Sequence, residues 1–278
     1  MRNRRRIRHK GGFRCRGGGL ISPGGGFVAV PIAEAGGITL DTLSPADIAA
    51  LTGFAEPTWM VRGGDAAGAL DLVGSDDLTD SGTPTKENAD TALAGTTTVM
   101  DDNTTDAMDA AANTVLDVAS ETITVMWIGK FAAANSAIRH VCGKRASAGG
   151  NYGWELQSAA SGSNNQFQWI ADSPSGIDIE AVAVDHGTTN AQVVVCTRSW
   201  ANNLVGIWTR EGTSSGARIQ DSMTNTATFA MGQQRITAAP CSHGALAVWI
   251  GTDGDWSATA ADFETARLAV ATALGYEP

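Results

Sequence analysis

The stretch from Ala191 to Gly212 constrains the fold of this chain most strongly, because it predicts a complete β-hairpin on its own. Residues 192–200 are rich in β-branched and aromatic side chains, and residues 204–210 resume the same extended pattern. Between them, Ala201 to Asn203 form a short turn that tolerates positive φ. Each strand carries a Trp, and a lone hairpin is marginal in water. The rest of the chain must therefore supply a second apolar layer.

Short extended segments of the same kind recur along the chain, separated by Gly, Asn, Asp and Ser. The segment at 121–131 is apolar on both faces in its second half, which indicates a central strand. Short strands and turns in regular succession are typical of a sandwich, so we predict an all-β, antiparallel, two-sheet fold. The predicted strands are residues 59–62, 96–100, 121–131, 139–144, 152–157, 166–171, 179–184, 192–200, 204–210, 226–231 and 244–250.

Two helices are predicted in addition to the strands. The first follows Ser44, which is a good N-cap, with Pro45 at the first helical position and Gly53 after the last turn. The second covers residues 257–274, where apolar residues recur at helical spacing until Gly275. We expect this C-terminal helix to pack across one end of the sandwich.

Positive charge is concentrated at the N terminus. Residues 1–16 contain eight of the 19 Lys and Arg and no acidic residue, whereas the remaining chain has 11 basic against 29 acidic residues, a net charge of −18. Residues 1–37 also contain several Gly runs and no hydrophobic periodicity, which is typical of a flexible extension. We therefore divide the chain into an anchoring arm (1–40), a short helix with a connector (41–56) and a sandwich domain (57–278).

The charge of the arm could hold an acidic protein surface, nucleic acid or lipid headgroups. Arginines without interleaved aromatic residues give only weak, salt-sensitive and sequence-blind attraction to nucleic acid, and the acidic body would repel a polyanion. We expect the arm to dock on an acidic protein lattice, where guanidinium groups pair with carboxylates, with no specific nucleic acid as partner. The docking residues are Arg2, Arg4, Arg5, Arg6, Arg8, Lys10, Arg14 and Arg16.

No run of 18 apolar residues occurs, so the sequence predicts no membrane-spanning segment. A secretory signal peptide is the alternative interpretation of the N terminus, since basic residues precede the apolar run 27–33 and the small residue Ala35. That run is short, contains Pro31 and is separated from the charges by Gly, which argues against secretion.

Three segments resemble LamG-type, concanavalin A-like domains. Residues 71–82 (DLVGSDDLTDSG) are similar to the opening segment of such domains, and residues 121–131 to one of their apolar strands. Residues 244–251, followed by Trp256, Ser257 and a helix, are similar to their last strand and closing turn. The resemblance covers about four fifths of the chain and implies a jelly-roll sandwich. Domains with this opening and a C-terminal helix occur in tailed-phage virion proteins, including head decorations, fibres and appendages.

Some relatives with this fold are glycoside hydrolases that carry Glu, Asp and Glu on alternate residues of one strand. Residues 176–180 (GIDIE) come near this pattern, but Gly176 stands where the nucleophile would be. Retaining hydrolysis needs two carboxylates about 5 Å apart. We therefore expect Asp178 and Glu180 to form a solvated strand face, and we predict no catalytic residue and no enzymatic activity.

Lectin-like relatives bind Ca²⁺ at the sandwich rim, and carboxylate and amide oxygens on loops are available for this role at Asp101, Asp102, Asn103, Asp106, Asp109, Asp253 and Asp255. These residues lack a defined ligand spacing, and solvated turn acids are the alternative. We expect no metal and no cofactor.

His140 with Cys142, and Cys241 with His243, would each present Cys and His on one face of a strand. Together they would compose a tetrahedral Zn²⁺ site if the two strands were neighbours. Buried free thiols are the preferred interpretation, a Cys142–Cys241 disulfide the second, and zinc the third. Cys15 differs because Arg14 and Arg16 flank it and favour the reactive thiolate, so we expect an intermolecular disulfide there.

The chain has eight Trp and two Tyr. Trp residues inside predicted strands, such as Trp127 and Trp208, are expected to fill the core. Four aromatic residues nearer to predicted loops are candidates for stacking on a sugar ring, although packing in the core or at a subunit interface is the preferred interpretation. They are Tyr152, Trp154, Trp169 and Trp256.

Taken together, these features predict a non-enzymatic structural protein of a tailed-phage virion, a head decoration, fibre or appendage subunit. The arm would dock on other virion proteins of the capsid, neck or tail, and the jelly roll would project outward as a homotrimer. A host surface glycan is its candidate ligand, and no membrane is expected as a partner. The alternative is a secreted or cell-surface carbohydrate-binding lectin domain.

Overall fold

A computed structural model describes the chain from residue 37 to residue 276, except for residues 64–67, 91, 94, 101–105, 111–115, 119–121, 132–137, 146–151, 162–163, 175, 184–189, 219–222, 224–226, 234–235, 237–238, 240 and 252–257. Residues 37–278 form one compact unit. Cys15 and all eight basic residues of the predicted arm lie outside the described residues.

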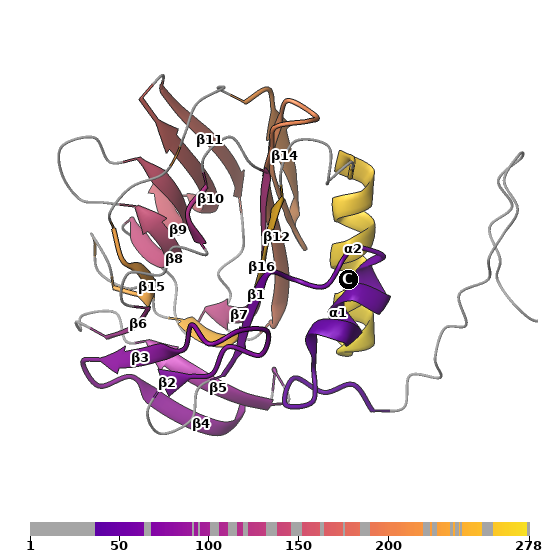
Figure 1. The fold of residues 1–278 in the computed structure, drawn as a ribbon. Helices are drawn as coiled ribbons and strands as arrows, with labels where there is room; N and C mark the ends of the chain where they lie inside the picture. Colours follow the sequence, from indigo (N-terminus) through magenta and orange to yellow (C-terminus); the bar gives the residue numbers. More distant parts are fainter. Residues whose placement is uncertain are drawn as a thin grey trace, which may run out of the picture. The chain divides into compact units, whose positions relative to one another are not determined.

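Two antiparallel sheets stack face to face (Figure 1). The first sheet has the order β14 (Gly212–Gly216), β13 (Leu204–Thr209), β12 (Gln192–Ser199), β7 (Thr122–Phe131), β16 (Cys241–Gly251), β5 (Gly95–Met100) and β4 (Thr85–Asp90), and β1 (Trp59–Arg62) pairs with β16. The second sheet has the order β11 (Gly176–Ala183), β10 (Asn164–Ser173), β9 (Gly153–Ser161), β8 (Arg139–Arg145), β15 (Phe229–Gly232), β6 (Ala107–Ala110), β3 (Leu78–Ser81) and β2 (Gly68–Ala69). The predicted all-β, two-sheet antiparallel sandwich is confirmed.

The hairpin predicted at residues 191–212 is formed by β12 and β13. Ser199 pairs with Leu204 at its closed end, and Asn203 in the turn has a φ of +48°. Among the residues that the structure describes, Asn203 is the one non-glycine residue with a positive φ. An Asn tolerates this conformation better than most side chains do, so the turn chemistry in the sequence matches the turn observed.

The core lies between the two sheets and is dominated by aromatic side chains. Ile123, Val125 and Trp127 of β7 point into it, and the ring of Trp127 lies 5.6 Å from that of Phe167 on β10. Gly129 makes room for this ring, because a Cβ there would collide with the Trp127 indole. The core therefore depends on a large side chain and a glycine placed two residues apart.

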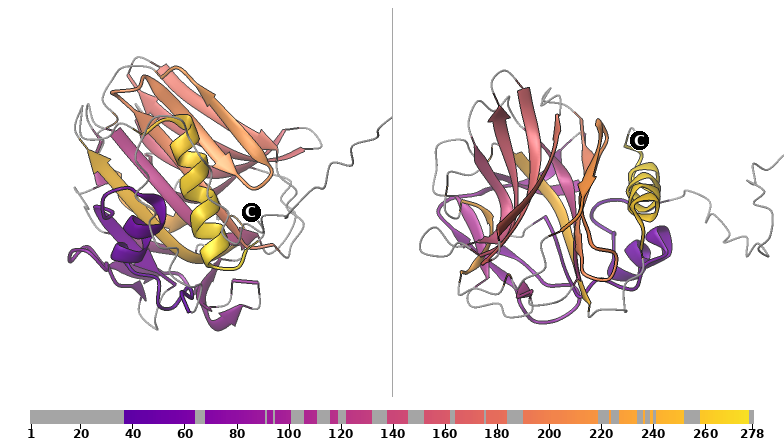
Figure 2. Two further views of the ribbon diagram at one scale, coloured as in Figure 1. Left: turned by 90° about the vertical axis from the view of Figure 1, so that its right-hand side faces the viewer. Right: turned by 90° about the horizontal axis from the view of Figure 1, so that it is seen from above.

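The other face of the first sheet is also apolar, and the helices cover it. Met126 and Ile128 of β7 belong to this second cluster, together with Phe263 of α2 (Ala260–Ala273), whose ring lies 4.9 Å from that of Trp208. Figure 2 shows α2 lying along this outer face. The prediction that the C-terminal helix packs across one end of the sandwich is wrong. The helix covers the outer face of the first sheet instead, because that face is apolar and has to be buried against another element.

The N-terminal helix α1 (Pro45–Thr52) begins as predicted, with Ser44 as its N-cap. The Ser44 hydroxyl accepts a hydrogen bond from the Asp47 backbone N–H, and the Asp47 carboxylate accepts one from the Ser44 N–H. This reciprocal capping fixes the start of the helix, which packs beside α2. None of the described helices is long and apolar enough to cross a membrane.

Candidate functional site

The outer face of the second sheet carries a set of polar side chains that we call the polar face. Strand alternation turns Phe167 and Trp169 of β10 into the core and sends Gln168 and Asp172 to the opposite side. Register then places β9 residues beside them, with Gln157 opposite Gln168. The polar face consists of Arg145, Glu155, Gln157, Gln166, Gln168 and Asp172.

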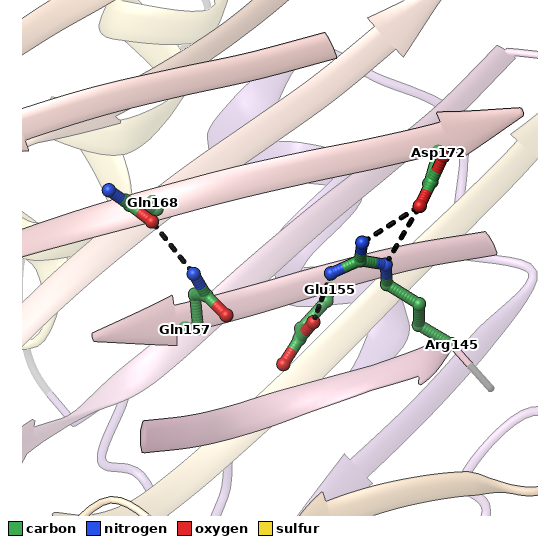
Figure 3. Close-up of polar contacts among 5 residues, drawn as sticks. All are labelled: Arg145, Glu155, Gln157, Gln168 and Asp172. Carbon is green, nitrogen blue, oxygen red and sulfur yellow. Dashed lines mark hydrogen bonds and ion pairs between the residues drawn. The ribbon is translucent and has the colours of Figure 1, made fainter. Parts of the chain in front are cut away.

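Arg145 joins the two carboxylates of this face (Figure 3). Its Nη2 lies 2.8 Å from Asp172 Oδ2, its Nε lies 3.2 Å from the same oxygen, and its Nη1 lies 3.2 Å from Glu155 Oε2. Gly153 is opposite both Arg145 and Asp172 in the sheet register, so the guanidinium crosses β9 where no side chain stands in its way. Glu155 has no exposed surface, whereas Asp172 is partly exposed and its Oδ1 has no partner in the described part of the chain.

The amide side chains form a second, parallel row. Gln157 Nε2 donates to Gln168 Oε1 at 2.7 Å, and Gln168 Nε2 donates to Gln166 Oε1 at 3.2 Å. Gln157 is buried, whereas Gln166 and Gln168 are half-buried. The buried amide thus orients the two that reach the surface, and the Nε2 of Gln166 remains without an acceptor among the described residues.

An exposed apolar strip lies beside these polar groups on β11, the edge strand of the sheet. Ile177 and Ile179 are 42% and 49% exposed and stand opposite Asp172 and Ile170 of β10. Ala181 is opposite Gln168, so the apolar surface of the strip becomes smaller further along the strand, because the Ala side chain is short. Hydrogen-bonding groups and apolar surface therefore lie on neighbouring strands, about 4.8 Å apart.

The sequence prediction missed the polar face, although the sequence contains two signals of it. The alternation in residues 166–172 (QFQWIAD) places two amides and a carboxylate on the side away from the aromatic residues. In addition, residues 146–197 contain no Lys or Arg. What the sequence could not show is that Arg145, 27 residues before Asp172, reaches this face.

The aromatic residues considered as candidates for stacking on a sugar lie elsewhere. Trp154 and Trp169 are 1% and 0% exposed, and their rings pack 5.8 Å apart inside the core. They are therefore closed to a sugar ring, and the preferred interpretation of core packing holds for both. Tyr152 is half-buried just before β9, and Trp256 lies outside the described residues.

Asp178 and Glu180 share a face of β11, as expected from their spacing, but this face is not solvated. They pair in register with Ala171 and Trp169, which point into the core, and Asp178 is only 7% exposed. Glu180 Oε2 accepts a hydrogen bond from the Ser214 hydroxyl at 2.5 Å. The prediction of a solvated strand face is wrong, because β11 closes against β14 at the edge of the sandwich.

No group of three or more His, Cys, Asp or Glu that could hold a metal ion occurs in the described parts of the chain. Of the acidic residues considered for Ca²⁺, Asp106 accepts a hydrogen bond from the Thr83 backbone N–H at 2.9 Å. Asp109 is on β6, where burial raises the pKa of its carboxyl. The remaining candidates, Asp101, Asp102, Asn103, Asp253 and Asp255, lie outside the described residues.

Cys142, Cys196 and Cys241 are buried free thiols, as the preferred interpretation has it. Cys142 is on β8 of the second sheet and Cys241 on β16 of the first, and both belong to the core between the sheets. Burial raises the pKa of each thiol. The thiols are therefore protonated and serve as small apolar side chains.

His243 is a core residue with both ring nitrogens occupied. Trp127 Nε1 donates to His243 Nδ1 at 2.9 Å, and His243 Nε2 lies 3.3 Å from Cys241 Sγ. Burial, followed by the nearby His140 and Lys86, lowers the pKa of His243 to about 3. The imidazole is therefore neutral and fixed in one tautomer, which leaves no nitrogen for a zinc ion.

Sequence comparison gives no match for this chain, since no protein-family model and no curated protein matches it. Solved structures do match. The binding domain of Paraclostridial Mosquitocidal Protein 1 is similar, with a TM-score of 0.54 and 11% identity over 77% of this chain and 52% of that one. This chain thus spans about half the length of that structure.

Two carbohydrate-active enzymes also contain similar structures. One is domain 4 of AbnA, a GH43 extracellular arabinanase from Geobacillus stearothermophilus, in complex with arabinotriose, with a TM-score of 0.50 and 12% identity over 71% of this chain and 91% of that domain. The other is a GH54 α-L-arabinofuranosidase, with a TM-score of 0.52 and 10% identity over 74% of this chain and 50% of that one. The identities are 10–12%, so these comparisons show the fold alone, which is a two-sheet antiparallel sandwich.

The depressed pKa of His243 predicts a loss of stability in acid. The unfolded chain protonates this side chain near pH 6.5, while the folded chain resists protonation until about pH 3. Stability is therefore fully present above pH 6.5 and falls as the pH drops, by about 3 kcal/mol at pH 4 from this group. Urea denaturation at several pH values should show a shallower fall for His243→Gln, and equal falls in both proteins would contradict the assignment.

Removal of Arg145 is expected to leave the buried carboxylate of Glu155 poorly compensated. Arg145→Met should cost about 3–5 kcal/mol of folding free energy, and Arg145→Met combined with Glu155→Gln should recover most of it. Lys86→Met is the matched control, because its partner Asp80 is partly exposed and the expected loss is about 1 kcal/mol. Chemical denaturation measures all four proteins. Equal losses at Lys86 and Arg145 would show that the Arg145 pair is not a buried one.

Proposed function

We propose that this chain is a non-enzymatic binding protein of a tailed-phage particle, in which the sandwich binds a glycan and the basic N-terminal segment fastens the chain. The polar face supports the binding role, because buried partners hold its exposed oxygen and nitrogen atoms in place. A site that is fixed before its ligand arrives loses less entropy on association.

A sugar suits the composition of this face. Its hydroxyl groups can donate to Asp172 Oδ1 and accept from Gln166 Nε2, while its C–H groups pack on Ile177 and Ile179. Binding sites commonly combine apolar surface with a few placed polar groups in this way. The similar arabinanase domain was solved with arabinotriose, and the similar mosquitocidal domain is described as a binding domain, which supports the same role here.

The absence of enzymatic activity is proposed from the burial of Glu155 and from the pairing of both Glu155 and Asp172 with Arg145. Glycoside hydrolysis needs both a carboxylic acid and a carboxylate that reach the glycosidic bond. Glu155 has no exposed surface and pairs with Arg145, which also holds Asp172. Such a pair can position a sugar, but Glu155 cannot reach a bond in one.

The attachment of the chain to a phage particle is proposed from the uneven distribution of its charge. Eight basic residues within the first 16 precede a remainder of net charge −18, and arginine pairs well with carboxylates. The N-terminal segment therefore suits an acidic partner such as a capsid, neck or tail protein. A homotrimer would bring three such segments and three polar faces together, which multiplies weak contacts through effective concentration.

A secreted or cell-surface lectin domain is the second candidate, favoured by the similarity to an extracellular arabinanase domain. The two candidates differ at the N terminus. A lectin secreted through a signal peptide would be cleaved near Ala35, whereas the particle protein keeps Arg2 to Arg16.

Intact mass and peptide mapping of native material distinguish these two candidates. We expect a chain that retains its N-terminal segment and co-purifies with capsid or tail proteins. Recovery of a processed chain free of any particle would favour the lectin instead.

Glycan binding is tested on the purified full-length chain with an array of oligosaccharides that includes arabinotriose. Gln168→Ala should weaken retention about 10-fold, because it removes the middle of the amide row and about 1.4 kcal/mol of binding corresponds to this factor. Leu70→Ala is the control, since Leu70 is 60% exposed and follows β2 at the opposite end of the sheet. Retention of no glycan by the wild-type chain would rule out the binding role.

A further inference from the structure

The charge around the polar face limits the class of glycan that it can take. Arg145 is the one basic residue of the face, and both of its neighbours there are carboxylates. From residue 146 to residue 197, a stretch that includes β9, β10 and β11, the sequence contains no Lys or Arg. Of its acidic residues, Glu155 and Asp172 lie on the polar face, whereas Asp178 and Glu180 lie on the core-facing side of β11. The polar face thus holds two carboxylates and one guanidinium, and that guanidinium is already paired with both.

We propose, building on the proposed glycan-binding function, that the polar face binds uncharged saccharides and rejects sialylated, sulfated and uronic-acid glycans. An anionic ligand would bring a third negative group to a guanidinium that two carboxylates already neutralise. Proteins that recognise carboxylate, sulfate or phosphate groups present unpaired Arg or Lys for that purpose. Here the repulsion from Asp172 and Glu155 acts as a filter against such ligands.

The exposed groups also indicate the length of the ligand. Asp172 and Gln168 are four residues apart on β10, about 13 Å along the strand, and Ile177 and Ile179 run beside them on β11. This span is longer than one sugar ring, so the face suits an oligosaccharide chain. Hydroxyl groups would meet β10, and C–H surfaces would meet the isoleucines.

The experiment uses the full-length chain and an array in which each neutral glycan is printed beside its sialylated, sulfated and uronic-acid counterparts. We expect neutral members to be retained and their anionic counterparts to bind at least about 10-fold more weakly at low salt. This difference in binding between neutral and anionic glycans should become smaller at high salt, because screening weakens the repulsion. Asp172→Asn should reduce the same difference in binding, since this change removes one of the two negative charges and keeps the shape of the side chain.

A variant pair tests whether the neutral glycan lies where the geometry places it. Ile177→Ala with Ile179→Ala should weaken neutral binding about 10-fold by removing apolar contact, while Leu70→Ala should leave it unchanged. Thermal melts confirm that each variant is folded, which is expected because all three side chains are exposed.

The outcomes separate this inference from the function on which it builds. Tighter retention of anionic than of neutral glycans by the wild-type chain would overturn the inference and leave glycan binding standing. If Ile177→Ala with Ile179→Ala leaves the binding of neutral glycans unchanged, the glycan does not lie on the polar face. Retention of no glycan of either class would remove both the inference and the proposed binding function.

Discussion

The packing of aromatic rings between the two sheets is the interaction on which the rest of the structure depends. Trp127 and Phe167 meet across the core, and Trp154 and Trp169 fill the space beside them. Since neighbouring residues of a strand face opposite ways, each ring that turns inward forces the residue beside it outward. Gln168 lies on the surface because Phe167 and Trp169 do not. The polar face is thus the reverse side of the core, and the same strands determine both.

Rigidity on the polar face comes from groups that a ligand would not touch. Glu155 is buried and holds Arg145, which in turn holds Asp172, and a buried Gln157 holds Gln168 in the same way. A buried ion pair is a weak source of net stability, so its contribution here is better understood as orientation. Gly153 matters equally, because any side chain at that position would stand between Arg145 and Asp172. The geometry therefore relies on one charge network and on one position that lacks a side chain.

Local pattern in the sequence was sufficient for the fold but not for the site. The strands β7, β12, β13 and β16 are long and apolar, so their propensity alone predicted them. The strands β3, β4, β6 and β14 were missed because they are short, at four to six residues, and rich in Thr, Ser, Asp or Ala, so only pairing with their neighbours makes them extended. The site was missed for a similar reason, since register decides that Trp169 faces inward and that Arg145 meets Asp172. Asp178 was assigned to solvent because nothing local shows that β11 closes against the opposite sheet.

The pairing of β1 with β16 has a consequence for how the chain is made. Trp59 lies opposite Val248, so β1, the first strand of the sandwich, pairs with β16, its last strand. β7 also pairs with β16. During translation, β1, β5 and β7 must remain without the strand that joins them until residues 241–251 have left the ribosome. Long-range pairing of this kind is slow and leaves apolar edges exposed in the meantime. A product truncated before β16 would therefore leave β1, β5 and β7 without their common partner, and the outer apolar face of the first sheet without α2.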